Sequence, residues 1–126
     1  MGVKHISTGS PFEAQIGYSR AVVSGGLVYV AGTTGYDYAS MTLPDSVVDQ
    51  CRNALSTIKT VLEQVGSSLD HVLRVNYVLA DRADFPACWP LTSAAFAVAR
   101  PAAMMIQAQL MEPAMKIEIE VTARLP

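Results

Sequence analysis

The sequence predicts an α+β fold, in which two amphipathic helices cover one face of a mixed β-sheet. Two observations indicate this fold. Segments typical of strands occur near both ends of the chain and once in the middle. Two longer segments between them are typical of helices. The expected order is therefore β-β-α-β-α-β-β, in a single domain spanning residues 1–126.

The first two strands are expected to form a hairpin. The segments RAVVSG and LVYVAG flank Gly25 and Gly26, a pair that tolerates the positive φ of a tight turn. The segment GTTGYDYASMTLP that follows, residues 32–44, is expected to be a loop.

The first helix is expected at about residues 44–65. Pro44 suits a first-turn position, Thr42 is a plausible N-cap, and Gly66 is a natural C-terminal stop. One apolar stripe runs along this helix at three- and four-residue steps: Val47, Cys51, Leu55, Ile58, Leu62 and Val65.

The second helix is expected to follow Asp84 and to end near Val98. Pro86 fits its first turn, but Pro90 fits a helix interior less well, so a start nearer Trp89 is also open. A helix between two strands usually makes a right-handed crossover, which places those strands parallel. The hairpins supply the antiparallel pairs of the mixed sheet.

The third strand, residues 71–79, alternates its side chains between two faces. One face is expected to carry Leu73, Val75, Tyr77 and Leu79, and the other Val72, Arg74, Asn76 and Val78. The last two strands are expected at about residues 102–110 and 115–125. In the final strand, the pattern KIEIEV places Glu118 and Glu120 on the face opposite the isoleucines.

The composition predicts a homo-oligomer. Hydrophobic residues make up 51% of the chain and charged residues 16%, whereas a soluble domain usually carries about a quarter charged residues. An apolar subunit interface would bury the surplus. If the second face of the sheet meets other subunits, Glu118 and Glu120 are partly buried and must be paired, solvated or functional. An ordinary solvated or ion-paired face is the alternative.

Charge and hydropathy argue against two classes of partner. The net charge of −2 and the lack of a Lys/Arg run argue against nucleic-acid binding. The longest apolar runs, such as residues 94–99, fall far short of the ~20 residues that a membrane-spanning helix needs. The N-terminal residues show no signal-peptide pattern, so a cytoplasmic protein is the default expectation.

The two cysteines and two histidines show no zinc-binding spacing. No metal site is therefore expected. Cys51 lies on the apolar stripe of the first helix, which favours a packing role. For Cys88 a role as nucleophile stays open, although no neighbouring feature supports it.

Several segments together resemble the RidA (YjgF, reactive intermediate deaminase) family over nearly the whole chain. They are Gly17-Tyr18, SGGLVYVAG, DRADF, RPA and KIEIEVTA. The resemblance implies a chorismate-mutase-like α+β subunit. It also implies a homotrimer whose three sheets form a closed inner barrel with the helices outside, and pockets in the clefts between subunits.

The resemblance also implies a chemistry and a set of site residues. Family members with full motifs hydrolyse reactive enamines and imines, such as 2-aminoacrylate, to keto acids and ammonia without a metal or cofactor. Carried over to this chain, Glu118 positions the attacking water and Tyr18 lines the pocket. Gly32 brings the backbone close to the ligand, and Glu120 is assigned a structural role.

The chain departs from the family pattern in the predicted pocket. Ala103 stands where the family has the arginine that binds the substrate carboxylate, and Met104 and Met105 follow it. Ala31 replaces a common serine, and Trp89 a common asparagine. These residues are expected to line a pocket with more apolar volume and fewer polar groups.

Three other arginines can be compared with the missing carboxylate-binding arginine: Arg100, Arg74 and Arg20. Arg100 matches the first arginine of the family motif, at the turn between helix and strand, where a surface or hinge role is expected. Arg74 or Arg20 is a candidate replacement, and pairing with Glu118 or Glu120 is the alternative role for Arg74. A charge-assisted pair in a cleft contributes about 1.5–3 kcal/mol. Because Ala103 cannot form this pair with a substrate carboxylate, standard 2-imino acid deamination is not expected.

Three functions stay open at this point. The first is hydrolysis of an enamine or imine of a small metabolite, with Glu118 holding the water. The second is a non-catalytic module that binds a small apolar ligand or a partner protein in the same clefts. The third is an endoribonuclease, a label often given to family members. The acidic balance and the scattered histidines make it the weakest.

Overall fold

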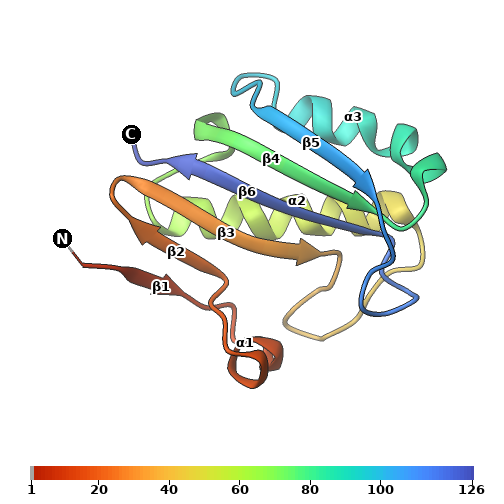
Figure 1. The fold of residues 1–126 in the computed structure, drawn as a ribbon, viewed down its shortest axis with the longest axis horizontal. Helices are drawn as coiled ribbons and strands as arrows, with labels where there is room; N and C mark the ends of the chain where they lie inside the picture. Colours follow the sequence, from red (N-terminus) through yellow and green to blue (C-terminus); the bar gives the residue numbers. More distant parts are fainter. Residues whose placement is uncertain (1) are drawn as a thin grey trace.

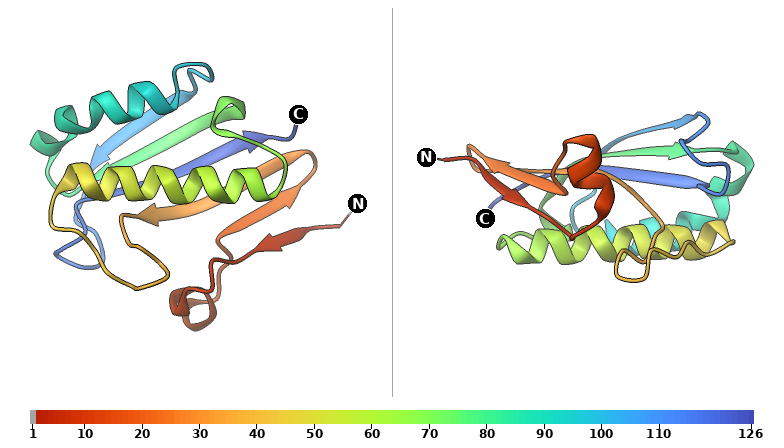
Figure 2. Two further views of the ribbon diagram at one scale, coloured as in Figure 1. Left: turned by 180° about the vertical axis from the view of Figure 1, so that it is seen from behind. Right: turned by 90° about the horizontal axis from the view of Figure 1, so that it is seen from below.

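The computed structural model describes residues 2–126, which form one mixed sheet with two long helices on the same face (Figures 1 and 2). This confirms the predicted α+β fold. The strands are β1 (Lys4–Ile6), β2 (Ala21–Ser24), β3 (Leu27–Thr34), β4 (Val72–Leu79), β5 (Ala102–Gln107) and β6 (Ile117–Arg124). The α-helices are α1 (Pro11–Ile16), α2 (Val47–Gln64) and α3 (Phe85–Ala95), and two single 3-10 turns are η1 (Leu69–His71) and η2 (Arg82–Asp84).

The strand order within residues 2–126 is β1-β2-β3-β6-β4-β5. Strands β4 and β5 are parallel neighbours joined by α3, as the crossover rule predicts. The other neighbouring pairs are antiparallel. The last strand, β6, lies between β3 and β4, which puts the KIEIEV segment near the centre of the sheet.

The first twenty residues contain two elements that the predicted order omits. Strand β1 pairs with β2 at the edge of the sheet. Helix α1 begins after Ser10, whose side chain accepts a hydrogen bond from the backbone N–H of Phe12, and Pro11 occupies the first turn. Gly17 ends the helix with a φ of 96°. The element is too short for apolar periodicity to reveal it.

The predicted hairpin is confirmed. Gly25 and Gly26 both have positive φ, 59° and 79°, as a two-residue turn of type I′ requires. Strand β3 continues to Thr34, so the following loop begins at Gly35 and not at position 32.

Helix α2 begins later than predicted. Ser46 is its N-cap and accepts a hydrogen bond from the N–H of Asp49. The predictions that Thr42 caps the helix and that Pro44 lies in its first turn are therefore wrong. Gly66 follows the end of the helix with a φ of 84°, which confirms it as the stop.

Helix α3 begins at Phe85 and includes Pro90 in its interior. The alternative start near Trp89 is therefore wrong, and the helix ends at Ala95, before the predicted Val98. Pro90 removes one backbone N–H donor from the helix, of which Cys88 is the one buried residue. Strands β5 and β6 are shorter than predicted, and both lie within the predicted ranges.

A bulge at the start of β4 changes which of its side chains are buried. Val72 faces Ala123, but Arg74 already faces Thr122, so Leu73 is an extra residue in the strand. Val72 is buried and Leu73 is 47% exposed, the reverse of the prediction for these two positions. From Val75 onward the predicted alternation holds.

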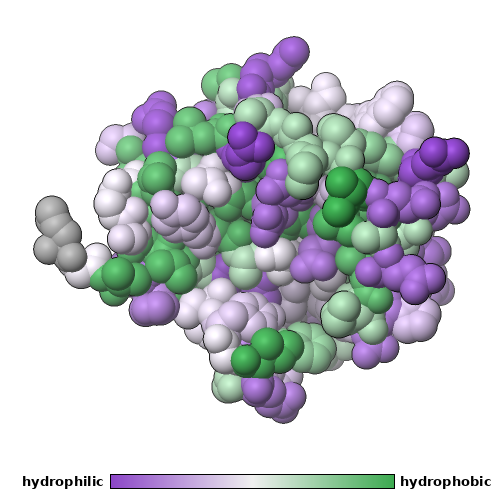
Figure 3. All heavy atoms as spheres, viewed as in Figure 1, coloured by the Kyte–Doolittle hydropathy of each residue, from purple (hydrophilic) through white to green (hydrophobic). Residues whose placement is uncertain are grey.

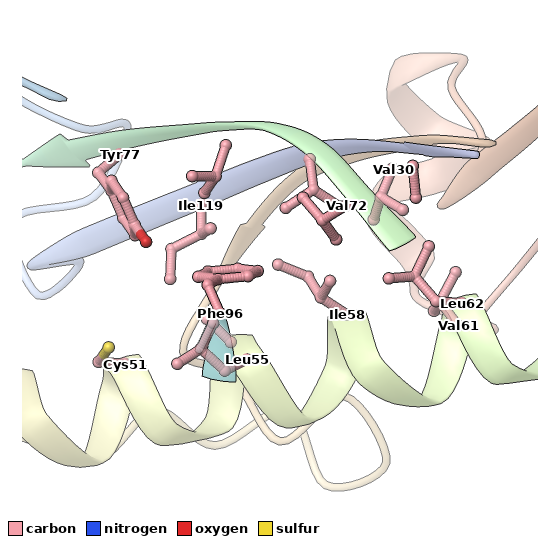
Figure 4. Packing of buried hydrophobic residues seen from close by; sticks show 14 of the residues in the cluster. Val30, Cys51, Leu55, Ile58, Val61, Leu62, Val72, Tyr77, Phe96 and Ile119 are labelled. Atoms are coloured by element: carbon pink, nitrogen blue, oxygen red, sulfur yellow. The ribbon is translucent and has the colours of Figure 1, made fainter. Parts of the chain in front are cut away.

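The hydrophobic core lies between the sheet and the helices. Figure 4 shows Val30, Val72 and Ile119 of the sheet pointing toward Ile58 and Leu62 of α2. The apolar stripe predicted for this helix packs here, and Cys51 is fully buried, which confirms its packing role. Cys88 is fully buried as well.

The opposite face of the sheet is uncovered in the single chain. Figure 3 shows this face, where apolar and polar side chains are mixed. All of β5 is exposed, including Met104 and Ile106, and Tyr29 of β3 is 47% exposed. Within residues 2–126, none of the helices is long and apolar enough to cross a membrane.

Candidate functional site

A cleft of about 730 Å³ lies beside the C-terminal half of β3. It is bordered by α1, by the loop that precedes β6, and by β6 itself. Four of the predicted site residues line it together: Tyr18, Ala31, Gly32 and Glu118. Its other lining residues are Phe12, Ile16, Thr34, Tyr38, Met111, Glu112 and Met115. We call this hollow the Glu118 cleft.

Glu118 projects into the cleft from the second position of β6. Its backbone pairs with Thr34 of β3 on one side and Val78 of β4 on the other. The carboxylate lies directly over Gly32, so close that a Cβ at position 32 would overlap its Oε2 atom. A side chain at position 32 would therefore displace the carboxylate.

The backbone beside Glu118 is irregular. The register between β3 and β6 shifts between Val30 and Thr33, which places a bulge at Ala31 and Gly32. Bulges turn a strand and redirect its groups, and they are common next to functional sites. Here the bulge leaves the carbonyl oxygen of Gly32 free to accept a hydrogen bond from a side chain.

The pKa of Glu118 is raised above its ordinary value of 4.5. Burial is the largest cause, because it disfavours the charged form, and the neighbouring Glu120 carboxylate adds to it. The guanidinium of Arg20 opposes the rise. A raised carboxyl pKa suits a general base, because proton transfer is most efficient when the pKa lies near the working pH.

Arg20 is fully buried directly behind the cleft wall. Its Nη1 donates to the carbonyl oxygen of Gly32 at 3.0 Å and to Oγ1 of Thr33 at 3.1 Å. Its Nη2 donates to the hydroxyl oxygen of Tyr18 at 3.2 Å. The guanidinium also lies over the rings of Tyr18 and Tyr38, 5.5 and 4.9 Å from their centroids. Arg20 therefore joins several parts of the wall.

Glu13 of α1 balances the charge of Arg20. Its Oε2 lies 3.9 Å from Nε of Arg20 and accepts hydrogen bonds from the backbone N–H and the hydroxyl of Thr8. Burial alone would raise the pKa of Glu13, but hydrogen bonds from Thr8 and Ser7 and the charge of Arg20 lower it below 4.5. The carboxylate is therefore ionised in the folded chain at neutral pH.

The remaining predicted pocket residues lie elsewhere in the single chain. Trp89, Ala103 and Met105 line a separate groove of about 640 Å³ between α3 and β5. We call it the α3/β5 groove. Arg100 lines the same groove from the turn before β5, with a φ of 45°. Met104 points to the other side of β5 and lines a third hollow with Gly32 and Glu118.

The two candidate replacement arginines lie in different settings. Arg20 touches the cleft wall from behind, where its Nη1 and Nη2 are hydrogen-bonded, while its buried Nε has no hydrogen-bond partner among the described residues. Arg74 is exposed and lies four positions along β4 from Val78, the partner of Glu118, which corresponds to about 13 Å along the strand. Within one chain Arg74 does not contact Glu118, and Glu120 accepts a hydrogen bond from Asn76 Nδ2 at 2.9 Å instead.

Cys88 faces the core and not either hollow. Burial raises the pKa of its thiol, and its Sγ lies 3.9 Å from the carbonyl oxygens of Val47 and Asp84. A nucleophilic cysteine needs an accessible thiolate. This environment supports a packing role for Cys88.

Sequence reasoning missed the residues that give the cleft its apolar wall. Phe12 and Ile16 belong to α1, and Met111 and Met115 to the loop after β5. The Ser10-Pro11 pair and Gly17 are start and stop signals that could have revealed α1. No comparable signal marks the loop.

The fold and the cleft define the class of protein: a small α+β domain with two carboxylates, Glu112 and Glu118, in a cleft that is otherwise mostly apolar. The sequence matches the family described as Endoribonuclease L-PSP over residues 8–125. The chain therefore belongs to this family, which is also called the RidA or YjgF family, and the predicted family is confirmed.

Several relatives resemble the chain over most of its length. The 2-iminobutanoate/2-iminopropanoate deaminase of Capra hircus is 32% identical over 96% of this chain and 90% of its own length. The structure of a YjgF/YER057c/UK114 family member from Mycobacterium tuberculosis has a TM-score of 0.89 at 35% identity, covering 98% of this chain and 100% of that one. RidA from the Antarctic bacterium Psychrobacter sp. gives 0.81 at 29% identity, covering 86% and 89%.

Proposed function

We propose that the chain hydrolyses enamines or imines of small metabolites in the Glu118 cleft, without a metal or cofactor. The observation that carries the proposal is the position of Glu118. Its carboxylate lies against Gly32 in a cleft that Tyr18 also lines, and its pKa is raised by burial. The relative from Capra hircus bears the name of such a deaminase.

The proposed reaction needs one base and one ordered water. An enamine first tautomerises to the imine. Glu118 takes a proton from water while the oxygen bonds to the imine carbon, and the C=N π electrons move to nitrogen, which receives the proton back from Glu118. The resulting carbinolamine loses ammonia as its hydroxyl proton leaves, giving the carbonyl product. The net change is imine plus water to carbonyl compound plus ammonia.

A second copy of the chain is proposed to close the cleft. The uncovered sheet face and the exposed strand β5 support a homo-oligomer, which the family resemblance makes a homotrimer. In this arrangement the α3/β5 groove of a neighbouring copy, with Trp89, Ala103 and Met105, would face the Glu118 cleft. Ala103 would then stand where an arginine usually binds the substrate carboxylate, which favours substrates that are less acidic than simple 2-imino acids.

The apolar cleft wall favours a second candidate function. Phe12, Ile16, Met111 and Met115 offer an apolar surface to a ligand. The same clefts could bind a small neutral ligand without catalysis. The endoribonuclease reading has less support, because the net charge of −2 does not favour contact with RNA phosphates.

A coupled assay with 2-aminoacrylate, 2-iminobutanoate and a neutral imine tests the proposal. Hydrolysis should exceed the uncatalysed rate and fall at least a hundredfold in Glu118→Ala, since a general base contributes about 10²–10⁴-fold. Glu120→Ala, assayed at a pH above the acid limb because Glu120 also raises the pKa of Glu118, is the matched control: this carboxylate lies two residues away and accepts a hydrogen bond from Asn76. Tight binding of a neutral ligand with no hydrolysis of any imine would favour the second candidate instead.

A further inference from the structure

The buried side chain of Arg20 has a bonding pattern that determines where the Tyr18 proton points. A guanidinium has only donors, so in the 3.2 Å contact the hydroxyl oxygen of Tyr18 must accept from Nη2. The phenolic proton of Tyr18 is then not used by Arg20. Because Tyr18 lines the Glu118 cleft, this proton is available to a group in the cleft.

The same guanidinium fixes a second part of the wall. Its Nη1 donates to the carbonyl oxygen of Gly32, which the β3 bulge frees from sheet pairing, and to the hydroxyl of Thr33. The Thr33 hydroxyl in turn donates to the carbonyl oxygen of Ala31 at 2.8 Å. One planar group therefore sets both the tyrosine and the bulged backbone on which the Glu118 carboxylate rests.

Arg20 is held too firmly to enter the cleft itself. It is fully buried, lies between the rings of Tyr18 and Tyr38, and has the Glu13 carboxylate 3.9 Å from its Nε. It does not line the cleft. It can act on a ligand only through the groups it holds.

We propose that Arg20 is a positioning residue that fixes the Tyr18 hydroxyl as a hydrogen-bond donor toward the ligand, opposite the acceptor Glu118. The cleft would then present a donor of fixed direction, Tyr18, and a base, Glu118, beside its other polar residues Thr34, Tyr38 and Glu112. It would select ligands that carry an acceptor atom, such as a carbonyl, carboxylate or imine nitrogen, next to an apolar group. This inference rests on the proposed use of the Glu118 cleft as a small-molecule site.

A double-mutant cycle on ligand binding tests the inference without requiring turnover. The probe is 2-oxobutanoate, a keto acid with an acceptor oxygen and a short apolar chain, measured by calorimetry or NMR. Loss of one hydrogen bond should weaken its binding about five- to tenfold in Tyr18→Phe. Arg20→Lys should give a similar loss in the wild-type background and little further loss in Tyr18→Phe. Equal losses in both backgrounds would show that Arg20 does not act through Tyr18 and would overturn the proposal.

A second readout needs no ligand and decides the matter even if 2-oxobutanoate fails to bind. The pKa of Tyr18 is raised by burial, while the charge and hydrogen bond of Arg20 lower it, and Tyr38 and Glu13 raise it. Ultraviolet titration of the tyrosines, with Tyr18→Phe subtracted, should therefore show the Tyr18 pKa moving upward in Arg20→Gln. Arg20→Lys, which keeps the charge, should move it less. An unchanged Tyr18 titration in folded variants would overturn the proposal.

The two tests separate this inference from the proposed function. Absent imine hydrolysis together with coupled Arg20 and Tyr18 effects would reject the enzyme and keep the positioning role. Hydrolysis that depends on Glu118 but shows no coupling between Arg20 and Tyr18 would keep the enzyme and reject the positioning role. Circular dichroism and melting curves of each variant confirm that the comparison is made between folded proteins.

Discussion

The Oε2 atom of Glu118 lies in the space that a β-carbon at position 32 would occupy. Gly32 has no positive φ that would require glycine, so the reason for a glycine here is the approach of the carboxylate and not backbone conformation. The position of the Glu118 carboxylate in β6 therefore depends on Gly32 in the bulge of β3. Both strands are needed to build the proposed catalytic position.

Gly32→Ala should therefore displace the Glu118 carboxylate while leaving the sheet intact. We expect imine hydrolysis to fall at least tenfold, because small displacements of a catalytic group are costly. The melting temperature should change by only a few degrees. Gly2→Ala is the matched control, since a Cβ there meets no neighbouring atom. Unchanged hydrolysis in Gly32→Ala would show that the carboxylate position does not matter.

The pH dependence of hydrolysis should report the raised pKa of Glu118. The base must be ionised to accept a proton, so the rate should fall as the pH drops through a pKa above 4.5. Glu120 contributes to the rise, so the acid limb should move to lower pH in Glu120→Gln. Removal of the Arg20 charge in Arg20→Gln should move it to higher pH. An acid limb that stays fixed in both variants would assign it to another group.

The residue pattern could predict the side of the sheet on which Glu118 lies, because alternation in KIEIEV has a period of two and the isoleucines are buried. It could not predict the bulges at Leu73 and Gly32, since a bulge depends on the pairing of two strands and not on one strand's sequence. This is why the prediction for Val72 and Leu73 was reversed.

Only the part of the candidate site that is formed by residues in or beside the family motifs could be predicted from the sequence. Tyr18, Ala31, Gly32 and Glu118 come together as expected, but Trp89 and Ala103 lie in another groove. A pattern along one chain does not reveal which copy of the chain supplies each side of a cleft. The sequence also could not predict that Arg20 is buried in a hydrogen-bond network, because arginines in proteins are mostly exposed.

Glu13→Gln should destabilise the folded protein at neutral pH. It removes the charge that balances buried Arg20, and removing one partner of a buried ion pair costs about 3–5 kcal/mol; because this pair is 3.9 Å apart and is not hydrogen-bonded, the lower end of that range is expected. The folded-state pKa of Glu13 is below 4.5, so its contribution is present above the unfolded-state value and is lost as the pH falls through the folded-state value. Urea unfolding at pH 7 and in acid should therefore show a difference from wild type that shrinks at low pH.

The control for Glu13→Gln is Arg52→Gln. Arg52 pairs with Asp49 on the surface of α2, where both side chains are more than half exposed, so the loss should be below about 1 kcal/mol. A loss in Glu13→Gln that is no larger, or that stays constant with pH, would contradict the role assigned to the buried pair.

Strand β5 should carry part of the subunit interface. Ile106 is 46% exposed and lies beside Met104 on the uncovered side of the edge strand. Ile106→Asp places a charge in this apolar surface and should shift the protein to monomers in sedimentation experiments. Lys59→Asp, on the exposed side of α2, should leave the assembly unchanged. A wild-type protein that is monomeric at micromolar concentration would refute the proposed oligomer.

Arg100 provides a test of whether the chain lacks an arginine that binds the substrate carboxylate. Among the described residues that line the α3/β5 groove it is the one cation, and it stands three positions before Ala103. Because Ala103 and not Arg100 occupies the position of the family arginine, Arg100→Ala should leave KM unchanged for both 2-iminobutanoate and a neutral imine. A contact with the substrate carboxylate would instead contribute equally in the ground and transition states, so its loss would raise KM with little change in kcat. A rise of about tenfold or more in KM for 2-iminobutanoate alone would therefore contradict the surface or hinge role predicted for Arg100 and would assign it the role of the missing arginine.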